Sequence, residues 1–293
     1  MAGTHVRQVR LGDHLCLPFT NDEEQREIVS AYIADGIRHG ERVLYFADRT
    51  EPAAIDGWLS HKGVDGALAV ARGQLTVRSA RGAEFDAATV VTGIHGEMRQ
   101  ARLDGYQGLR WTGEMSWALG SSELARYESG IAATVSTAGD VAAICQYDER
   151  LFDSDSVNGL VAFHTSVVRI DPLHDGRRLR VVPTFNPRGL KVIGTVDDGT
   201  VDGLIEALSE AFRWPDVVLH LDVAELEFID VAGVRAIVRL AGRLGDKRRL
   251  QIDHLKPTLR KVMAIVGWDR APGLRFGSAP ARNDDLDEEV GSA

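Results

Sequence analysis

Cysteines and long apolar runs are scarce in this chain, and each shortage excludes a class of protein. Only two cysteines occur among 293 residues, too few for a disulfide-stabilised scaffold of this length. No run of about 18 apolar residues is present, so the sequence predicts no membrane-spanning helix. The first residues contain no apolar segment that would serve as a signal peptide. Together these shortages predict a cytoplasmic protein.

Positive charge is also in short supply. The chain has 34 Lys and Arg against 43 Asp and Glu, which gives a formal net charge of −9. This balance argues against nonspecific binding to nucleic acid or to an anionic membrane. Part of the acidity is local, because the segment 281–293 contains acidic and small residues and almost nothing apolar. We therefore expect this segment to be a disordered tail.

What the sequence does contain is a regular alternation of strand and helix patterns. The chain is long enough for two domains with substantial cores. In its first part, helical patterns separate five apolar runs, which lie at 14–19, 42–48, 74–80, 108–117 and 141–148. Because these runs are almost continuously apolar, they predict a mainly parallel sheet covered by helices on both faces.

A second unit is predicted to begin where Pro, Gly and Arg accumulate, between residues 171 and 184. The pattern of 177–199 indicates a strand pair, and 200–212 has one apolar face at helical spacing. Strands and helices then alternate to about residue 276. We expect α/β domains at 1–175 and 180–280, followed by the tail at 281–293.

Residues 187 to 276 carry several landmarks in a fixed order. Gly194 and Asp197 form a G-x-x-D pattern after a strand, and "LDVAELEFID" at 221–230 precedes Gly233, which opens a helix. Over this stretch the sequence resembles the STAS domain, the fold of bacterial anti-sigma factor antagonists. The resemblance implies a STAS-type α/β fold. It also implies an anti-sigma factor as partner, including one with a histidine-kinase-like ATPase fold.

Two hydroxyl groups are missing at the place where this resemblance would put them. In switchable members of the family, the Asp is followed by Ser-Ser or Ser-Thr and then Gly, and the partner kinase phosphorylates one hydroxyl. Here Val231 and Ala232 stand between Asp230 and Gly233, and neither side chain can accept phosphate. Three outcomes are open. The domain binds its partner constitutively under control of the first domain, binds a partner that never phosphorylates it, or has kept only the fold.

We expect the partner to contact this turn and the helix that follows it. The candidate contact residues are Asp230, Val231, Ala232, Gly233, Arg235 and Arg239. Two of them also have purely structural interpretations. Asp230 is a good helix N-cap, a role worth about 1 kcal/mol, and Gly233 is equally suited to close packing.

The first domain contains the pieces "DHLCLPFTNDEEQREIVSAYIADGIRHGERVLYFAD", "GYQGLRWTGEMSWAL", "RYE" and "AAICQYDERLF". With these pieces, residues 12 to about 170 resemble the MEDS sensory domain, named for sensors of methanogens and methylotrophs. The first piece is also similar to the start of a RecA-like ATPase domain, in which a phosphate loop joins a strand to a helix. A phosphate loop needs glycines and a lysine. The segment "PFTNDEEQRE" has neither, so we expect a RecA-like topology with a degenerate phosphate loop and no ATP hydrolysis there.

Open parallel sheets bind ligands at the carboxyl ends of their strands. We therefore expect a small-molecule site in the first domain, with aromatic walls and polar anchors. The candidates are His14, Cys16, Glu114, Trp117, Tyr147, Asp148 and His164. Each also has a structural interpretation, as a core aromatic, a small buried thiol or a carboxylate that caps a turn.

A metal site is a further interpretation of some of these residues. His14 and Cys16 alternate on one strand and so face the same side. Cys145 and His164 would join them if their strands were neighbours. No CxxC or HExxH pattern accompanies these residues, so the sequence predicts no metal and no cofactor.

The sequence thus predicts a signalling regulator that is not an enzyme, in which a sensory domain controls a STAS domain. Two alternatives remain open. One is a degenerate RecA-like nucleotide-binding enzyme that works through Glu114. The other is a STAS scaffold component of a sensory complex, and a homo-oligomer is compatible with either arrangement.

Overall fold

The computed structural model describes residues 3–245 and 247–277. The chain divides between Asp171 and Pro172 into two compact units, and each unit is described by itself. The domain boundary expected from the sequence, at 175–180, lies a few residues further along. The acidic tail expected at 281–293 lies outside the described residues.

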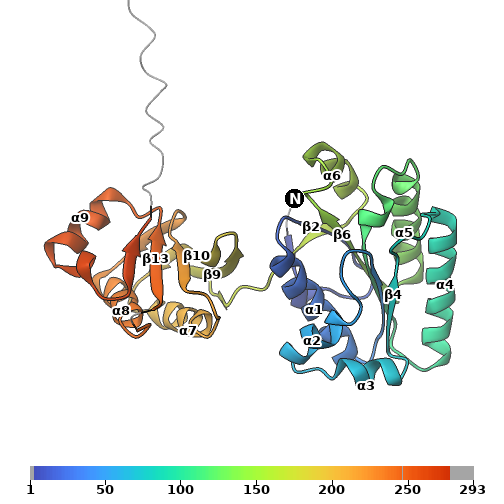
Figure 1. The fold of residues 1–293 in the computed structure, drawn as a ribbon, viewed down its shortest axis with the longest axis horizontal. Coiled ribbons are helices and arrows are strands. Elements are labelled where there is room, and N and C mark those ends of the chain that lie inside the picture. Colours follow the sequence, from blue (N-terminus) through green and yellow to red (C-terminus); the bar gives the residue numbers. More distant parts are fainter. Residues whose placement is uncertain (1–2, 246, 278–293) are drawn as a thin grey trace, which may run out of the picture. The chain divides into compact units, whose positions relative to one another are not determined.

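The first unit is built on a seven-stranded sheet (Figure 1). All of its neighbouring strands are parallel. The strand order is β1 (Gly3–His5), β7 (Ser166–Arg169), β2 (His14–Phe19), β6 (Val141–Asp148), β5 (Leu109–Glu114), β3 (Arg42–Ala47) and β4 (Leu75–Ser79). The five predicted apolar runs supply β2 to β6. The sequence did not reveal β1 and β7, because three or four residues carry too little periodicity.

Helices cover both faces of this sheet (Figure 1). One face packs against α1 (Asp22–Arg38), α2 (Ala54–His61) and α3 (Gly66–Ala71). The other packs against α4 (Ala87–Leu103), α5 (Leu124–Ala138) and α6 (Ser154–Val161). The predicted mainly parallel α/β sheet is therefore confirmed.

Alternate residues of the two central strands β2 and β6 enter different helix layers. Leu15 and Leu17 pack in the layer of α1, whereas Cys16 and Cys145 pack in the layer of α4 and α5. Cys16 lies directly opposite Cys145 in the parallel register. Because side chains alternate along a strand, His14 and Tyr147 face the same layer as the two cysteines.

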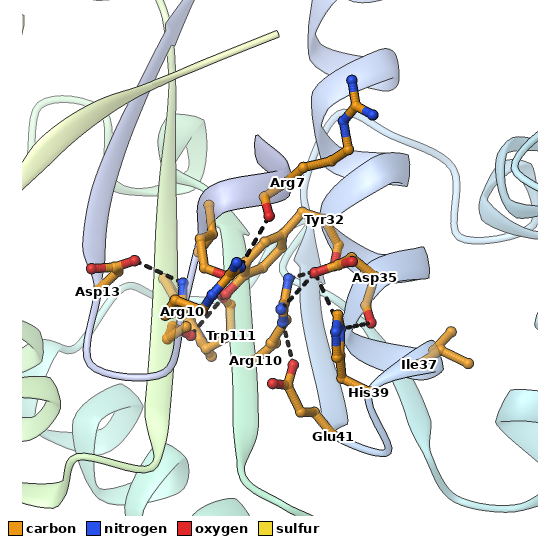
Figure 2. A network of polar contacts seen from close by, with 12 residues as sticks. Arg7, Arg10, Asp13, Tyr32, Asp35, Ile37, His39, Glu41, Arg110 and Trp111 are labelled. Atoms are coloured by element: carbon orange, nitrogen blue, oxygen red, sulfur yellow. Dashed lines mark hydrogen bonds and ion pairs between the residues drawn. The ribbon is translucent and has the colours of Figure 1, made fainter. Parts of the chain in front are cut away.

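A buried arginine ties α1 to the middle of the sheet (Figure 2). Arg110 of β5 is only 1% exposed. Its guanidinium contacts the carboxylates of Glu41 and of Asp35, the latter at 2.8 Å. It also lies over the Tyr32 ring, with 4.9 Å between the guanidinium carbon and the ring centroid. These partners offset the cost of removing the Arg110 charge from water.

The second unit contains a mixed sheet (Figure 1). The strand order is β14 (Leu274–Phe276), β13 (Arg249–Asp253), β11 (Val218–Asp222), β10 (Arg188–Val196), β9 (Leu179–Phe185) and β8 (His174–Asp175). β9 and β10 form the predicted strand pair, which is antiparallel. The helices α7 (Val201–Ala211), α8 (Val231–Ala241) and α9 (Pro257–Ile265) bury their apolar faces in one core with the strands.

The strand β12 (Leu226–Ile229) pairs with the far half of β10 and leads directly into α8. The pairing register of β10 shifts just after Gly194, which has φ +94°. A side chain at this position would collide with the backbone carbonyl of Arg178. A glycine is therefore required at this bend, and the bend sets where the β12–α8 turn emerges.

Arg110→Met should lower the free energy of unfolding of the first unit by about 3–5 kcal/mol, because Glu41 would be left buried without its counter-charge. Arg102→Met is the matched control. Its ion pair with Asp140 lies at the surface, so the loss should be much smaller than that of Arg110→Met. Chemical denaturation of the full chain, followed by near-UV circular dichroism, measures both. Equal losses would contradict the role assigned to Arg110.

Candidate functional site

A polar cleft opens at the carboxyl edge of the sheet in the first unit, the usual ligand position in open parallel sheets. Its volume is about 590 Å³. A smaller adjoining pocket extends toward Glu114, Gln146 and Asp148. Charged groups dominate the lining of the larger cleft, including Asp22, Asp48, Arg49, Glu51, Arg81 and Arg150.

The loop between β2 and α1 does not offer a phosphate site. The side-chain oxygen of Asn21 accepts hydrogen bonds from the backbone N–H of Glu23 at 2.8 Å and of Glu24 at 3.4 Å. It therefore uses N–H groups that would otherwise bind a phosphate at the helix start. Three acidic residues in the first turn of α1 add negative charge. At the position where a phosphate loop was expected to be degenerate, the structure has a capped helix start.

Glu114 anchors a loop. Its Oε2 accepts hydrogen bonds from the backbone N–H groups of Asp48, Arg49 and Thr50 at 3.0, 2.6 and 3.1 Å. Its Oε1 accepts a hydrogen bond from the Tyr45 hydroxyl. Burial, together with the Glu114 charge, raises the pKa of Tyr45 well above its usual value, so this hydroxyl stays protonated and donates. A carboxylate that is 3% exposed and holds four donors is poorly placed to act as a general base.

The charges of the cleft are largely paired with one another. Arg150 donates to both carboxylate oxygens of Asp148, at 2.7 and 2.8 Å, and also reaches Asp22. Burial alone would raise the pKa of Asp148, but the hydrogen bonds from Arg150 hold it below its usual value. Arg81 pairs with Glu51 at 2.7 Å. The cleft therefore presents a balanced polar surface, suited to a small polar molecule.

A second cluster lies inside the first unit, in the layer of α5. The ligand-type atoms of His14, Glu128, Cys145 and His164 all lie within 4.8 Å of one another, and all four residues are buried. Tyr147 donates a hydrogen bond to Glu128. Burial lowers the pKa of His164 to about 4 and raises the pKa of the Cys145 thiol well above its usual value.

The structure thus divides the seven predicted ligand residues between different places. Glu114 and Asp148 line the smaller pocket that adjoins the cleft, whereas His14, Tyr147 and His164 belong to the buried cluster or contact it. His14 is the first residue of β2, so its placement at a carboxyl strand end was wrong. Trp117 stacks on Phe46, and Cys16 is a core residue opposite Cys145. The seven residues therefore do not share one cleft.

Sequence reasoning missed Glu128, although it lies in the quoted piece "RYE". A signal was present. Glu128 falls on the apolar stripe of α5 together with Leu124, Ile131 and Val135, all of which are buried. A carboxylate on such a stripe needs buried partners, and the histidines and Tyr147 are those partners.

In the second unit, the predicted partner surface lies at the start of α8. Asp230 is confirmed as the N-cap, since its carboxylate accepts a hydrogen bond from the Gly233 N–H at 2.7 Å. Val231 is 60% exposed, and Ala232, Arg235 and Arg239 are exposed as well.

Gly233 differs from its neighbours because it is buried. A Cβ there would lie 2.6 Å from Val196 Cγ1. This residue therefore serves the packing of α8 on β10.

An apolar groove adjoins this turn. It has a volume of about 130 Å³ and is lined mainly by Val223, Leu226, Phe228, Ile229, Leu255 and Leu259. Phe228 is 55% exposed. Large apolar side chains gathered at one exposed turn are typical of a protein-binding surface.

Comparison with known families agrees with both resemblances. Residues 13–165 match the model of the MEDS domain, described as the MEthanogen/methylotroph, DcmR Sensory domain. The chain belongs to the MEDS family. Residues 179–275 match a second model, described as "Mlab, STAS domain". The order of a MEDS domain followed by a STAS domain, expected from the sequence, is confirmed.

Two solved structures are similar to parts of this chain. The KaiC-like protein PH0186 from Pyrococcus horikoshii OT3 is 12% identical with a TM-score of 0.41, over 59% of this chain and 77% of that one. An anti-sigma factor antagonist from Mycobacterium paratuberculosis is 21% identical with a TM-score of 0.28, over 32% of this chain and 78% of that one. No curated protein matches the chain. Among the described residues, no helix is long and apolar enough to cross a membrane.

Glu114→Ala should destabilise the MEDS domain by about 3 kcal/mol, because it removes the common acceptor of three backbone N–H groups and a tyrosine hydroxyl. Glu51→Ala, which removes a surface ion pair with Arg81, is the control and should cost less than about 1 kcal/mol. Thermal or chemical denaturation of the full chain measures the difference. Glu114 would instead be catalytic if the wild-type chain hydrolysed ATP and the Glu114→Ala variant lost this activity while keeping full stability.

Proposed function

We propose that this chain is a signalling regulator without enzymatic activity. In this proposal the MEDS domain receives a small polar molecule in the cleft at the carboxyl edge of its sheet. The STAS domain delivers the signal by binding an anti-sigma factor. The matched pair of domains supports a sensory input joined to a protein-binding output.

The observation that carries the proposal is the surface at the β12–α8 turn. Phe228 and Val231 are each more than half exposed there. They lie beside the apolar groove, which Phe228 and Leu259 help to line. Arg235 and Arg239 are exposed on α8. An apolar centre with basic residues at its rim suits a partner that offers an apolar pocket edged by acidic side chains.

The same turn lacks a chemical switch. Val231 and Ala232 are accessible, so a hydroxyl at either position would be within reach of a kinase. The start of α8 would also favour a phosphate group through its free N–H groups. Because neither side chain has a hydroxyl, we infer that this surface stays in one covalent state and that control comes from the MEDS domain.

The absence of enzymatic activity is inferred from the side chains at the degenerate phosphate loop and at Glu114. Asn21 and the acidic first turn of α1 disfavour a nucleotide phosphate. Glu114 is fully hydrogen-bonded to a loop and to Tyr45. Both features favour the regulator over the degenerate nucleotide-binding enzyme.

Phe228→Ala should weaken binding to an anti-sigma factor of the native host by at least tenfold, since exposed aromatic side chains at an interface centre typically contribute more than about 1.4 kcal/mol. Val217→Ala is the matched control, because Val217 is 63% exposed but precedes β11 at the opposite strand end. The affinity of the Val217→Ala variant for the same anti-sigma factor should stay within about twofold of wild type. Calorimetry with the full chain measures both values.

Equal effects of the two substitutions would place the interface elsewhere. A chain that binds no anti-sigma factor and forms large assemblies in size-exclusion chromatography with light scattering would be a STAS scaffold instead.

Val231→Ser or Ala232→Ser should restore phosphorylation by an anti-sigma factor with kinase activity, because Asp230 and the helix start are intact. The modified variant should then release that partner. Mass spectrometry after incubation with the partner and ATP locates the phosphate, and the wild-type chain should take up none. Phosphate on another residue of the wild-type chain, coupled to partner release, would overturn the proposed loss of the switch.

A further inference from the structure

The buried cluster in the MEDS domain brings four metal-ligand side chains from four separate segments to one point. His14 comes from β2, Cys145 from β6, Glu128 from α5, and His164 from the turn between α6 and β7. Glu128 Oε2 lies 3.2 Å from His14 Nε2, 3.3 Å from His164 Nε2 and 3.5 Å from Cys145 Sγ. Cys145 Sγ also lies 3.5 Å from His14 Nε2.

Both imidazole rings are oriented by their other nitrogen. His14 Nδ1 lies 3.1 Å from the carbonyl oxygen of Phe163, and His164 Nδ1 lies 2.9 Å from that of Leu160. A carbonyl oxygen can only accept, so each Nδ1 carries the proton and donates. Nε2 of each ring therefore points into the cluster, the arrangement typical of metal-binding histidines.

One buried atom of the cluster has no hydrogen-bond partner. His164 Nε2 is fully buried, and no donor or acceptor within the described part of the chain pairs with it. It lies near Glu128 only at ion-pair distance. A buried polar nitrogen without a partner is costly, and a metal ion at the centre of the cluster would supply that partner.

The spacing of these atoms also fits a bound metal. A tetrahedral Zn²⁺ with bonds of about 2.0–2.3 Å holds its ligand atoms about 3.3–3.8 Å apart. Four of the six separations, 3.2, 3.3, 3.5 and 3.5 Å, lie in or next to this range, and the other two are at most 4.8 Å. Tyr147 fixes the second oxygen of Glu128, as an outer hydrogen bond does for a ligating carboxylate.

We propose that His14, Glu128, Cys145 and His164 bind one divalent transition-metal ion in the MEDS domain. Two imidazoles, one thiolate and one carboxylate form a set of intermediate softness, and Zn²⁺ fits it best. The ion joins β2 and β6 to α5 and to the turn before β7. This site goes beyond the proposed function, because it exists whether or not the STAS domain binds an anti-sigma factor.

The site differs from the metal set considered from the sequence by one ligand. The set considered from the sequence contains Cys16 and lacks Glu128. In the structure Cys16 lies opposite Cys145 on the neighbouring strand, but its thiol is not among the four converging groups. The two cysteines are therefore a natural pair for a test, since both are fully buried and only one is a ligand.

The test uses the full chain without an affinity tag, produced in medium that contains either Zn²⁺ or Co²⁺. Elemental analysis by mass spectrometry should find about one metal ion per chain. The Co²⁺ form should show a thiolate-to-cobalt charge-transfer band in the near ultraviolet, together with the visible bands of a four-coordinate ion. This wild-type spectrum requires no substitution and so does not depend on how well a variant folds.

Cys145→Ser should abolish the charge-transfer band and lower metal content at least tenfold, whereas Cys16→Ser should keep both. His164→Gln should also lose the metal, although it retains both thiols. Wild-type protein without metal above background would overturn the proposal and leave a shared proton as the occupant of the cluster. A charge-transfer band that persists in Cys145→Ser, or disappears in Cys16→Ser, would overturn the ligand assignment.

Discussion

β2 and β6 pair in parallel from His14 with Ala143 to Phe19 with Asp148. This pairing lies in the interior of the MEDS sheet, and it distributes side chains in three directions. One set packs beneath α1, the next set turns toward α5, and the strand ends open into the polar cleft. Cys145 and Asp148 are only three residues apart in sequence, yet Cys145 belongs to the buried cluster and Asp148 to the small pocket beside the cleft. The strand alternation alone separates these two environments.

Buried charge in the MEDS domain is handled in each case by local partners. Arg110 has two carboxylates and an aromatic ring, and Glu114 has three backbone N–H groups and a hydroxyl. Glu128 differs, because the groups around its Oε2 are two imidazole nitrogens and a thiol, all of metal-ligand type. This contrast within one domain is what distinguishes the cluster from ordinary structural ion pairs.

The strands such as 14–19 could be predicted because they are almost continuously apolar, and the helices such as α8 because their apolar residues recur at helical spacing. The bend at Gly194 could not, since it depends on the nearby Arg178 carbonyl. The site was predicted less well than the fold. Asp230 could be recognised as a helix N-cap from the sequence, because capping depends only on residues close by in the chain. Glu128 meets His14 across more than a hundred residues of sequence, and no short-range pattern encodes that encounter.

The hydrocarbon side chains of Val231 and Ala232 have a kinetic consequence for the proposed regulator. A phosphorylated turn keeps a record of past kinase activity until a phosphatase erases it. A turn without hydroxyls keeps no such record. Its output would follow the present occupancy of the sensory cleft, and the time needed to reset would be the residence time of the bound molecule. The chain would then report what the cell contains now, with no memory of what it contained before.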